Sequence, residues 1–131
     1  MIKEFSYTLK IYYEDTDAGG VVYHSNYLKY LERARSEAIY TLGLSNKGLL
    51  KKYGILILVK SCNIEYLKPA IFEDVIKIIS VVRSITKTSF VMEQKIYKEN
   101  QMITKANIHL VVVNQKGKPC KIPKILKEGF K

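Results

Sequence analysis

The feature that most constrains the fold is a change in hydrophobic period, from two to about 3.6 and back again. Residues 5–13 alternate between apolar and polar side chains, which is typical of a half-buried strand. From Asn26 onward, apolar residues recur at three- and four-residue steps, which predicts one amphipathic helix of about four turns. We expect Ser25 or Asn26 to be its N-cap and Gly43 to end it. Its apolar stripe consists of Tyr27, Leu31, Ala34, Ala38 and Leu42.

The remainder of the chain is mainly strand-like. Segments 55–67, 74–83, 90–98 and 102–113 are rich in Ile and Val or alternate in polarity, and short helices are expected at 46–52 and after Pro123. Strands that follow one another through short connections favour an antiparallel sheet. The expected class is α+β: a five-stranded antiparallel sheet wrapped around one long central helix.

Length and charge limit the partners of the chain. Its 131 residues predict a single domain, residues 1–131. The net charge of +10 suggests an anionic partner, such as nucleic acid, a membrane surface or a phosphate-bearing ligand. The lysines are spread over nearly every segment, which favours a general compositional bias instead. Only three scattered arginines are present, which argues against nucleic acid.

Targeting and redox features point to the cytoplasm. The N-terminus lacks the apolar stretch of a secretory signal, and no apolar run approaches the roughly 20 residues of a membrane span. Cys62 and Cys120 lack CxxC spacing and neighbouring histidines, so we expect reduced thiols without a disulfide or zinc site. No cluster of metal ligands is present, and we expect neither a metal nor a cofactor.

Scarce titratable residues are concentrated in one stretch, YEDTDAGGVVYHSNY at residues 13–27. It holds two of the three aspartates and one of the two histidines. The expected strand delivers Tyr13, a glycine loop carries Asp15 and Asp17, and His24 precedes the helix. Backbone N–H groups at a helix start are unpaired and carry the positive end of the helix dipole. A carboxylate that faces them supplies the parts of an acyl-transfer site.

Each of these residues also has a purely structural interpretation. Asp15 and Asp17 are common turn formers. Tyr13 on an apolar strand face is most often part of the core, and His24 is compatible with a neutral residue near a helix cap. The residues alone therefore indicate a site without naming its substrate.

A resemblance to a known family narrows the function. Residues 12–39, YYEDTDAGGVVYHSNYLKYLERARSEAI, resemble the signature of the hydroxybenzoyl-CoA thioesterase branch of hotdog proteins. They are most similar to the bacterial Tol–Pal-associated acyl-CoA thioesterases, the YbgC type. The segments YLKPA at 66–70, with Asp74 after it, and KTSF at 87–90 also resemble this family. The resemblance covers essentially the whole chain and implies a hotdog fold and acyl-CoA thioester hydrolysis.

The resemblance also implies roles for single residues. Asp17 would be the catalytic carboxylate, acting as the nucleophile or as the general base for water. The backbone N–H of His24 would be the oxyanion donor, and Tyr13 would position the water or the carboxylate. Asp15 would shape the loop. The hydroxybenzoyl enzymes carry a proline after the catalytic aspartate where this chain has Ala18, which favours the YbgC type over an aromatic substrate.

In this family the site forms between subunits joined edge to edge, so we expect a homodimer or homotetramer. Lys60, Arg83 and Lys87 are candidates to bind the phosphates of CoA, although an acidic acyl-carrier protein is an equally reasonable partner for a basic rim. We expect His109 to be a surface or interface residue. The other expected substrate-binding residues are Gly20, Val22, Tyr23, Asn26, Tyr27 and Ser89.

Two alternative functions stay open on the sequence. A hydroxyacyl dehydratase would share the fold, but it requires a His-Phe-Pro type strand-to-helix motif that this chain lacks. A non-catalytic basic module would bind a partner in the cell envelope or in phospholipid synthesis. Acyl-CoA turnover by the purified protein separates this scaffold role from an enzyme.

Overall fold

The computed structural model describes residues 3–131, so the first two residues of the predicted domain lie outside it. The described residues form three helices, one short 3-10 helix and five strands. The helices are α1 (His24–Thr41), α2 (Asn46–Tyr53) and α3 (Lys124–Gly129), and the 3-10 helix is η1 (Tyr13–Asp15). The strands are β1 (Glu4–Lys10), β2 (Ile55–Tyr66), β3 (Val75–Ile85), β4 (Ser89–Lys98) and β5 (Gln101–Asn114).

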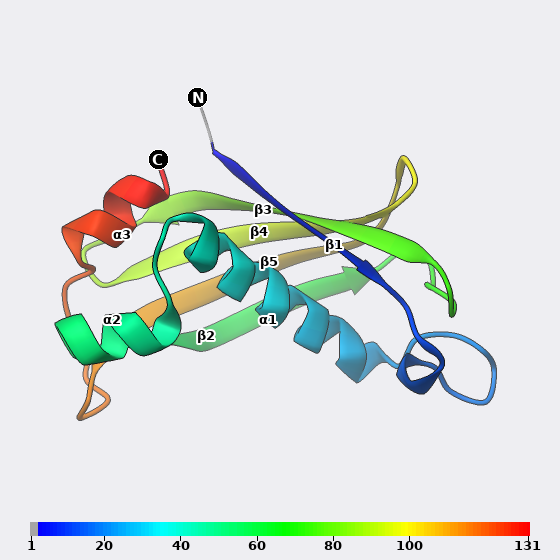
Figure 1. The fold of residues 1–131 in the computed structure, drawn as a ribbon, viewed down its shortest axis with the longest axis horizontal. Coiled ribbons are helices and arrows are strands. Elements are labelled where there is room, and N and C mark those ends of the chain that lie inside the picture. The colour runs from blue at the N-terminus through cyan, green and yellow to red at the C-terminus, as the bar shows by residue number, and fades with distance from the viewer. Residues whose placement is uncertain (1–2) are drawn as a thin grey trace.

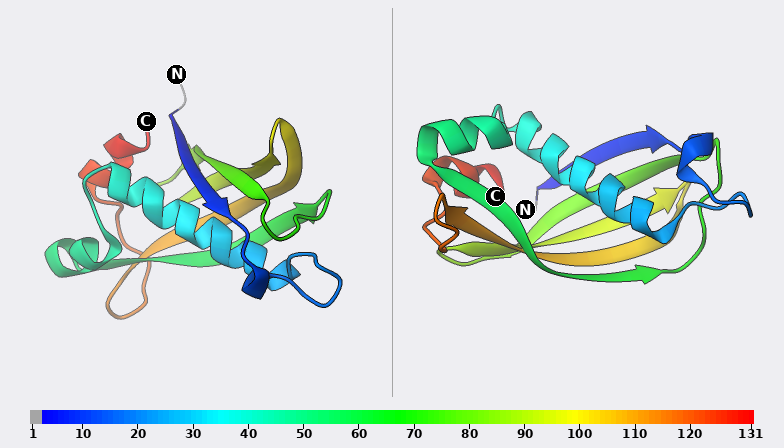
Figure 2. Two further views of the ribbon diagram at one scale, coloured as in Figure 1. Left: turned by 45° about the vertical axis from the view of Figure 1, so that its right-hand side comes forward. Right: turned by 90° about the horizontal axis from the view of Figure 1, so that it is seen from below.

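The five strands form one antiparallel sheet in the order β1-β3-β4-β5-β2. The sheet curls around α1, which lies across its concave face (Figures 1 and 2). This arrangement confirms the predicted α+β class and the sheet wrapped around one central helix. Strand β2 pairs only with β5 and therefore forms an edge of the sheet.

The core lies between α1 and the sheet. Leu31, Ala34 and Ala38 of α1 are buried, and the two alanines let the helix backbone approach the strands closely. On β4 every second residue from Phe90 is buried, as period-two alternation requires: Phe90, Met92, Gln94 and Ile96. Gln94 is the polar member of this row and is fully buried.

The first strand is shorter than predicted, because the strand it pairs with, β3, does not extend beyond Val75. Lys10 pairs with Val75, the first residue of β3. The Ile11 N–H then donates to the Asp74 carbonyl (2.8 Å), and the chain turns into η1. Tyr13 is consequently 77% exposed and does not lie on the apolar face of a strand.

The start of α1 also differs from the prediction. The helix begins at His24, with Tyr23 at the N-cap position and no side-chain cap, so the predicted caps Ser25 and Asn26 are wrong. Asn26 already lies in the first turn of the helix, and its Nδ2 donates to the Asp15 carbonyl (2.8 Å). The predicted end is confirmed, because Gly43 follows the last turn in the left-handed region (φ 77°).

Two negative findings apply to residues 3–131. No helix there is long and apolar enough to cross a membrane. Cys62 is exposed and Cys120 is half-buried, and both are unpaired in this part of the chain.

Candidate active site

The glycine loop between η1 and α1 is a tight hairpin. Thr16 and Val22 form an isolated antiparallel bridge, and the Asp17 N–H donates to the Val21 carbonyl (2.9 Å). The Gly20 N–H donates back to the Asp17 carbonyl (3.0 Å), with Gly20 in the left-handed region (φ 80°) that glycine adopts without strain. The hairpin therefore presents Asp17 at its tip.

The Asp17 carboxylate is held by the loop itself. Its Oδ1 accepts a hydrogen bond from the Gly19 N–H (2.8 Å). A Cβ atom on Gly19 would lie 3.2 Å from this oxygen, so a larger residue would push the carboxylate out of place. No acidic or basic side chain within residues 3–131 forms an ion pair with Asp17, and the side chain is only half-buried. Its second oxygen is available to a water or a substrate.

Asp15 anchors the loop to the helix. Its Oδ2 accepts from the Tyr12 N–H (2.8 Å), and its carbonyl accepts from Asn26 Nδ2 (2.8 Å) and the Tyr23 N–H (3.2 Å). The hydroxyl of Tyr30 is buried nearby, and burial, followed by the negative charge of Asp15, raises its pKa. These contacts support the loop-shaping role expected for Asp15.

His24 offers a free N–H group at the start of α1, directly after the loop. As the first residue of α1 it has no acceptor within its helix, and no other acceptor for this N–H occurs in residues 3–131. The imidazole stacks on the Tyr66 ring (4.3 Å between centroids, 17° between planes), and the Tyr66 hydroxyl donates to the His24 carbonyl (3.3 Å). The helix start is thus held against the end of β2.

Tyr27 supports this arrangement from the core. Its hydroxyl accepts from the Ala70 N–H (3.0 Å), and its ring meets the Tyr66 ring edge to face (5.3 Å, 63°). Burial raises the pKa of Tyr27, which keeps the hydroxyl protonated. The sequence prediction missed Tyr66 as a site residue. The only signal for it was its place at the start of the YLKPA segment.

The other residues expected around the loop lie together. Val22 is buried, and its N–H donates to the Ala70 carbonyl (2.9 Å), whereas Tyr23 is half exposed. The structure therefore places Gly20, Val22, Tyr23, Asn26 and Tyr27 within one hairpin and the first turn of α1.

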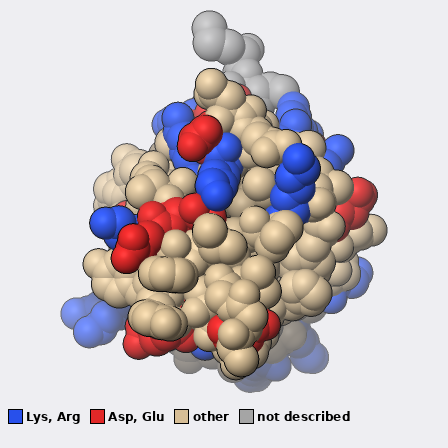
Figure 3. Space-filling model, turned by 90° about the vertical axis from the view of Figure 1, so that its right-hand side faces the viewer, with Lys and Arg blue, Asp and Glu red and all other residues tan. Residues whose placement is uncertain are grey.

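Tyr13 lies beside this loop, stacked on Phe72 (5.0 Å, 11°). Figure 3 shows the end of the molecule at which η1 lies, and the middle of this face is largely uncharged, with acidic and basic side chains around it. The large exposed side chains of this end include Tyr12, Tyr13, Tyr23, Leu67, Ile71 and Phe72. No hydrogen bond joins the Tyr13 hydroxyl to residues 3–131, so it is available for the positioning role expected of it.

The residues expected to bind phosphate lie elsewhere in the chain. Lys60 is exposed at an irregularity in the edge strand β2. Lys87 lies in the turn between β3 and β4, and Ser89 is the first residue of β4. This turn is next to α3 and far from the Asp17 loop (Figure 1). The Lys87 carbonyl accepts from the Ile122 N–H (2.9 Å), and Ser89 Oγ lies 2.8 Å from Thr86 Oγ1.

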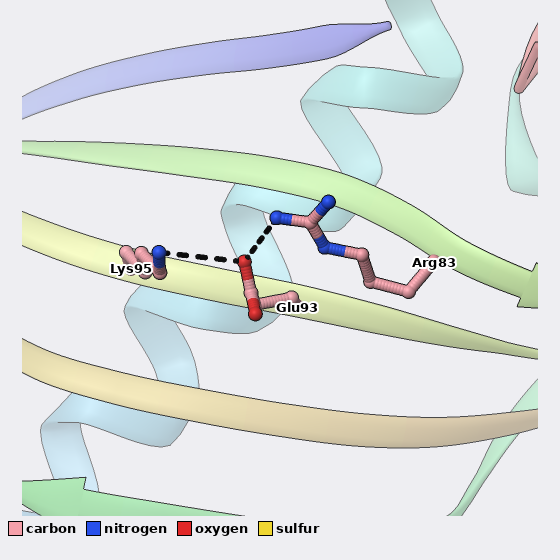
Figure 4. A network of polar contacts seen from close by, with 3 residues as sticks. All are labelled: Arg83, Glu93 and Lys95. Carbon is pink, nitrogen blue, oxygen red and sulfur yellow. Dashed lines mark hydrogen bonds and ion pairs between the residues drawn. The ribbon is translucent and has the colours of Figure 1, made fainter. Parts of the chain in front are cut away.

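Arg83 is already paired. Its Nη2 lies 2.9 Å from Glu93 Oε1, and Lys95 Nζ approaches the same oxygen at 3.6 Å (Figure 4). This cluster lies on the face of the sheet turned away from α1. The Arg83 hydrogen bond is the main cause that lowers the pKa of Glu93. His109 lies half-buried on the same face of β5.

A cavity of about 290 Å³ opens between the second half of α1, α2 and the first half of β2. Its walls are mostly apolar and include Ile39, Leu49, Phe90 and Met92, with Arg35 at the helix side. Val59 of the edge strand also lines it, so the cavity reaches the free edge of the sheet. Within residues 3–131, no group of three or more His, Cys, Asp or Glu side chains is arranged to hold a metal ion.

Comparison with known proteins assigns the family. The thioesterase-like superfamily matches residues 12–130. This chain belongs to that superfamily. The chain is 36% identical to "Acyl-CoA thioesterase YbgC" of Haemophilus influenzae, over 96% of this chain and 93% of the relative. It also superimposes on a hypothetical protein of Aquifex aeolicus with a TM-score of 0.90 and 30% identity, covering 97% of this chain and 99% of the other.

The fold is shared more widely. The chain matches the 4-hydroxybenzoyl-CoA thioesterase of Pseudomonas sp. strain CBS-3 with a TM-score of 0.89, over 96% of this chain and 98% of the other. At 21% identity this likeness shows the hotdog fold alone. The hotdog architecture expected from the sequence is therefore confirmed.

Proposed function

We propose that this protein hydrolyses acyl-CoA thioesters to a free carboxylic acid and CoA, with Asp17 as the catalytic carboxylate. Two observations carry the proposal. The Gly19 N–H holds the Asp17 carboxylate in the hairpin. The helix that follows this hairpin in the chain begins at His24, whose N–H is unpaired. The relationship to a protein named acyl-CoA thioesterase supports the choice of substrate.

The chemistry uses few groups. The thioester carbonyl oxygen would accept a hydrogen bond from the His24 N–H, which stabilises the negative charge that develops during attack. Asp17 either attacks the carbonyl carbon or takes a proton from the attacking water, and in both cases the C–S bond breaks and the CoA thiolate leaves. If Asp17 attacks, a mixed anhydride forms, and a water then hydrolyses it to the free acid and restores the carboxylate. In either case the water supplies the proton that the thiolate takes up. Loss of an oxyanion donor typically costs about 3–4 kcal/mol, so positioning and this donor supply much of the catalysis.

We further propose a homodimer built along β2, with a homotetramer as the larger alternative. An antiparallel pair of β2 strands would bring the Tyr66 end of one chain beside the Ile55 end of the other. The His24 and Asp17 region of one chain would then approach the cavity of its partner. The cavity would hold the acyl chain, and the exposed Lys60 of β2 would be available to the CoA phosphates.

The resemblance also leads us to expect a cytoplasmic enzyme associated with the Tol–Pal system. Acyl-carrier protein stays an alternative acyl donor, and a scaffold role in phospholipid synthesis stays an alternative to catalysis. Cell fractionation tests the location. Thiol release from acyl-carrier-protein thioesters, compared with CoA thioesters, tests the donor.

The first prediction compares two neighbouring aspartates. Asp17→Asn keeps an oxygen that accepts from the Gly19 N–H but removes the nucleophile or base, so kcat should fall by about 100-fold or more. The matched control, Asp15→Asn, should keep most activity, because Asp15 acts through the loop. Thiol release from short, medium and long acyl-CoAs measures both. Full activity of a folded Asp17→Asn protein would exclude the proposed role, and wild-type protein inactive on every acyl-CoA would exclude the function.

A further inference from the structure

Arg35 is a half-buried cation in the second half of α1, on the wall of the cavity. Its Nη1 donates to Gln94 Oε1 (3.0 Å). Burial lowers the pKa of Arg35, the expected direction for a cation removed from water, and the guanidinium nevertheless stays charged. A charged side chain beside an apolar cavity calls for an explanation.

The position of Arg35 is set by Gln94. Gln94 is fully buried, and its Nε2 donates to the Leu31 carbonyl and to Ser80 Oγ, both at 3.0 Å. Both amide hydrogens are therefore used, which leaves the Gln94 carbonyl oxygen to face Arg35. This network ties α1, β3 and β4 together and keeps the guanidinium at the cavity wall.

The charge of Arg35 has no acidic partner within residues 3–131. No carboxylate there lies within 4.0 Å of its guanidinium. Glu32 also lines the cavity, and its negative charge raises the Arg35 pKa against the larger effect of burial, but its side chain is exposed and forms no ion pair with Arg35. An arginine has five N–H donors, and within residues 3–131 only Gln94 accepts a side-chain hydrogen bond from Arg35. A half-buried cation without an ion-pair partner gains binding energy from a ligand carboxylate that pairs with it.

We propose that Arg35 binds a carboxylate at the far end of the acyl chain, so that the preferred substrates are CoA monothioesters of dicarboxylic acids. This inference rests on the proposed thioesterase function and names its substrate class. A guanidinium presents two parallel N–H groups that match the two oxygens of a carboxylate. A plain acyl chain of the same length ends in a methyl group and leaves the cation unpaired.

The size of the cavity is compatible with such a chain. At roughly 30 Å³ for each water-sized group, a volume of about 290 Å³ holds an acyl chain of short to medium length. Apolar walls such as Ile39, Phe90 and Met92 suit its methylene groups, and Arg35 suits its charged end.

A matched pair of substrates tests the inference on the wild-type protein. Adipoyl-CoA and hexanoyl-CoA have the same chain length and differ in the terminal carboxylate. We expect kcat/KM to be at least about tenfold higher for adipoyl-CoA, the usual scale of a hydrogen bond to a charged group. Equal values, or a preference for hexanoyl-CoA, would overturn the inference and leave the thioesterase function standing. Release from neither thioester, nor from longer ones, would overturn both.

Variants at Arg35 separate recognition from support of the fold. Arg35→Gln should lower the ratio of the two kcat/KM values about tenfold, and Arg35→Lys, which keeps the charge, should retain part of the preference. The control, Arg33→Gln, changes an exposed arginine of the same helix and should leave the ratio unaltered. If Arg35 only fastens α1 to the sheet, Arg35→Gln should lower kcat/KM equally for both substrates. That result would refute our assignment. Should Arg35→Gln not fold, the test rests on Arg35→Lys: a ratio of kcat/KM values equal to that of the wild type would refute the assignment, and a lower ratio would support it.

Discussion

The role of a single residue in this protein depends on its hydrogen-bond and ion-pair partners in the folded chain. Asp15 and Asp17 are separated by one residue. Asp15 accepts from the Tyr12 N–H through its carboxylate and from Asn26 Nδ2 through its carbonyl, across the loop. The Asp17 carboxylate accepts, within residues 3–131, only from the Gly19 N–H two residues further on. The first is therefore tied to the scaffold, and the second keeps an oxygen free. Arg83 is a further example, because Glu93 occupies the guanidinium that we expected to bind phosphate.

The Arg83–Glu93 pair predicts a pH-dependent stability. Because the pair lowers the Glu93 pKa, its contribution is present above the ordinary glutamate pKa of about 4.3 and is lost as the pH falls through the lowered value. Arg83→Gln should therefore lower the free energy of unfolding near neutral pH, and the difference from wild type should disappear in acid. Urea unfolding over a pH series measures it. Arg33→Gln is the control, because Arg33 forms no ion pair within residues 3–131. A difference that stays constant with pH would contradict the pairing.

The helices differ in how they begin. Ser45 is a true N-cap of α2, since its Oγ accepts from the Gly48 N–H (2.9 Å). At the start of α1, by contrast, no side chain caps the helix, and Ser25 is already its second residue. The uncapped N–H groups of α1 directly follow the glycine loop that carries Asp17. Leaving them unpaired costs helix stability but makes them available to a developing negative charge.

This difference gives a matched pair of substitutions. Ser45→Ala should lower the free energy of unfolding by about 1 kcal/mol, the usual effect of losing an N-cap. Ser25→Ala should be close to neutral, because the Ser25 side chain makes no capping hydrogen bond. Urea unfolding of both variants tests the assignment. Equal losses at the two positions would mean that Ser25 acts as a cap after all.

At the scale of the whole molecule, the free edge of the sheet is the main unpaired feature. Strand β2 is 12 residues long, and its open side lacks a partner strand within residues 3–131. Leu56, Leu58 and Val59 are exposed on it, and Lys60 is its only charge before Asn63. A long apolar edge is a template for pairing with another strand. This exposure supports the proposed dimer along β2.

A charge on this edge should therefore separate the subunits. Leu58→Asp places a carboxylate where the side chain is 47% exposed, and we expect it to lower the mass in light scattering and to reduce thioesterase activity. Ile125→Asp is the control on α3, where the exposed fraction is nearly the same, 46%. It should change neither quantity. Unaltered assembly of Leu58→Asp, or a monomeric wild type, would argue against a dimer along β2.

Much of the fold was predictable because local periodicity encodes it. The four later strands and the two longer helices appear within a few residues of their predicted bounds. The first strand was predicted three residues too long. Its alternation continues to Tyr13, but pairing stops where β3 begins, and the position of a partner strand is not part of the local pattern. The start of α1 was misplaced for a similar reason, because Asn26 binds the Asp15 carbonyl across the loop.

The candidate site also has a part that was predictable from the sequence and a part that was not. The sequence by itself determined the elements, and its 13–27 stretch identified the loop, because strand, glycine turn and helix start are adjacent in the chain. Only the tertiary structure placed Tyr66 on His24, paired Arg83 with Glu93 and set Arg35 on Gln94 at the cavity wall. The Tyr66 and Gln94 contacts join residues 42 and 59 positions apart. Such contacts depend on how strands pair and how a helix packs across them, and no local pattern of residues specifies that.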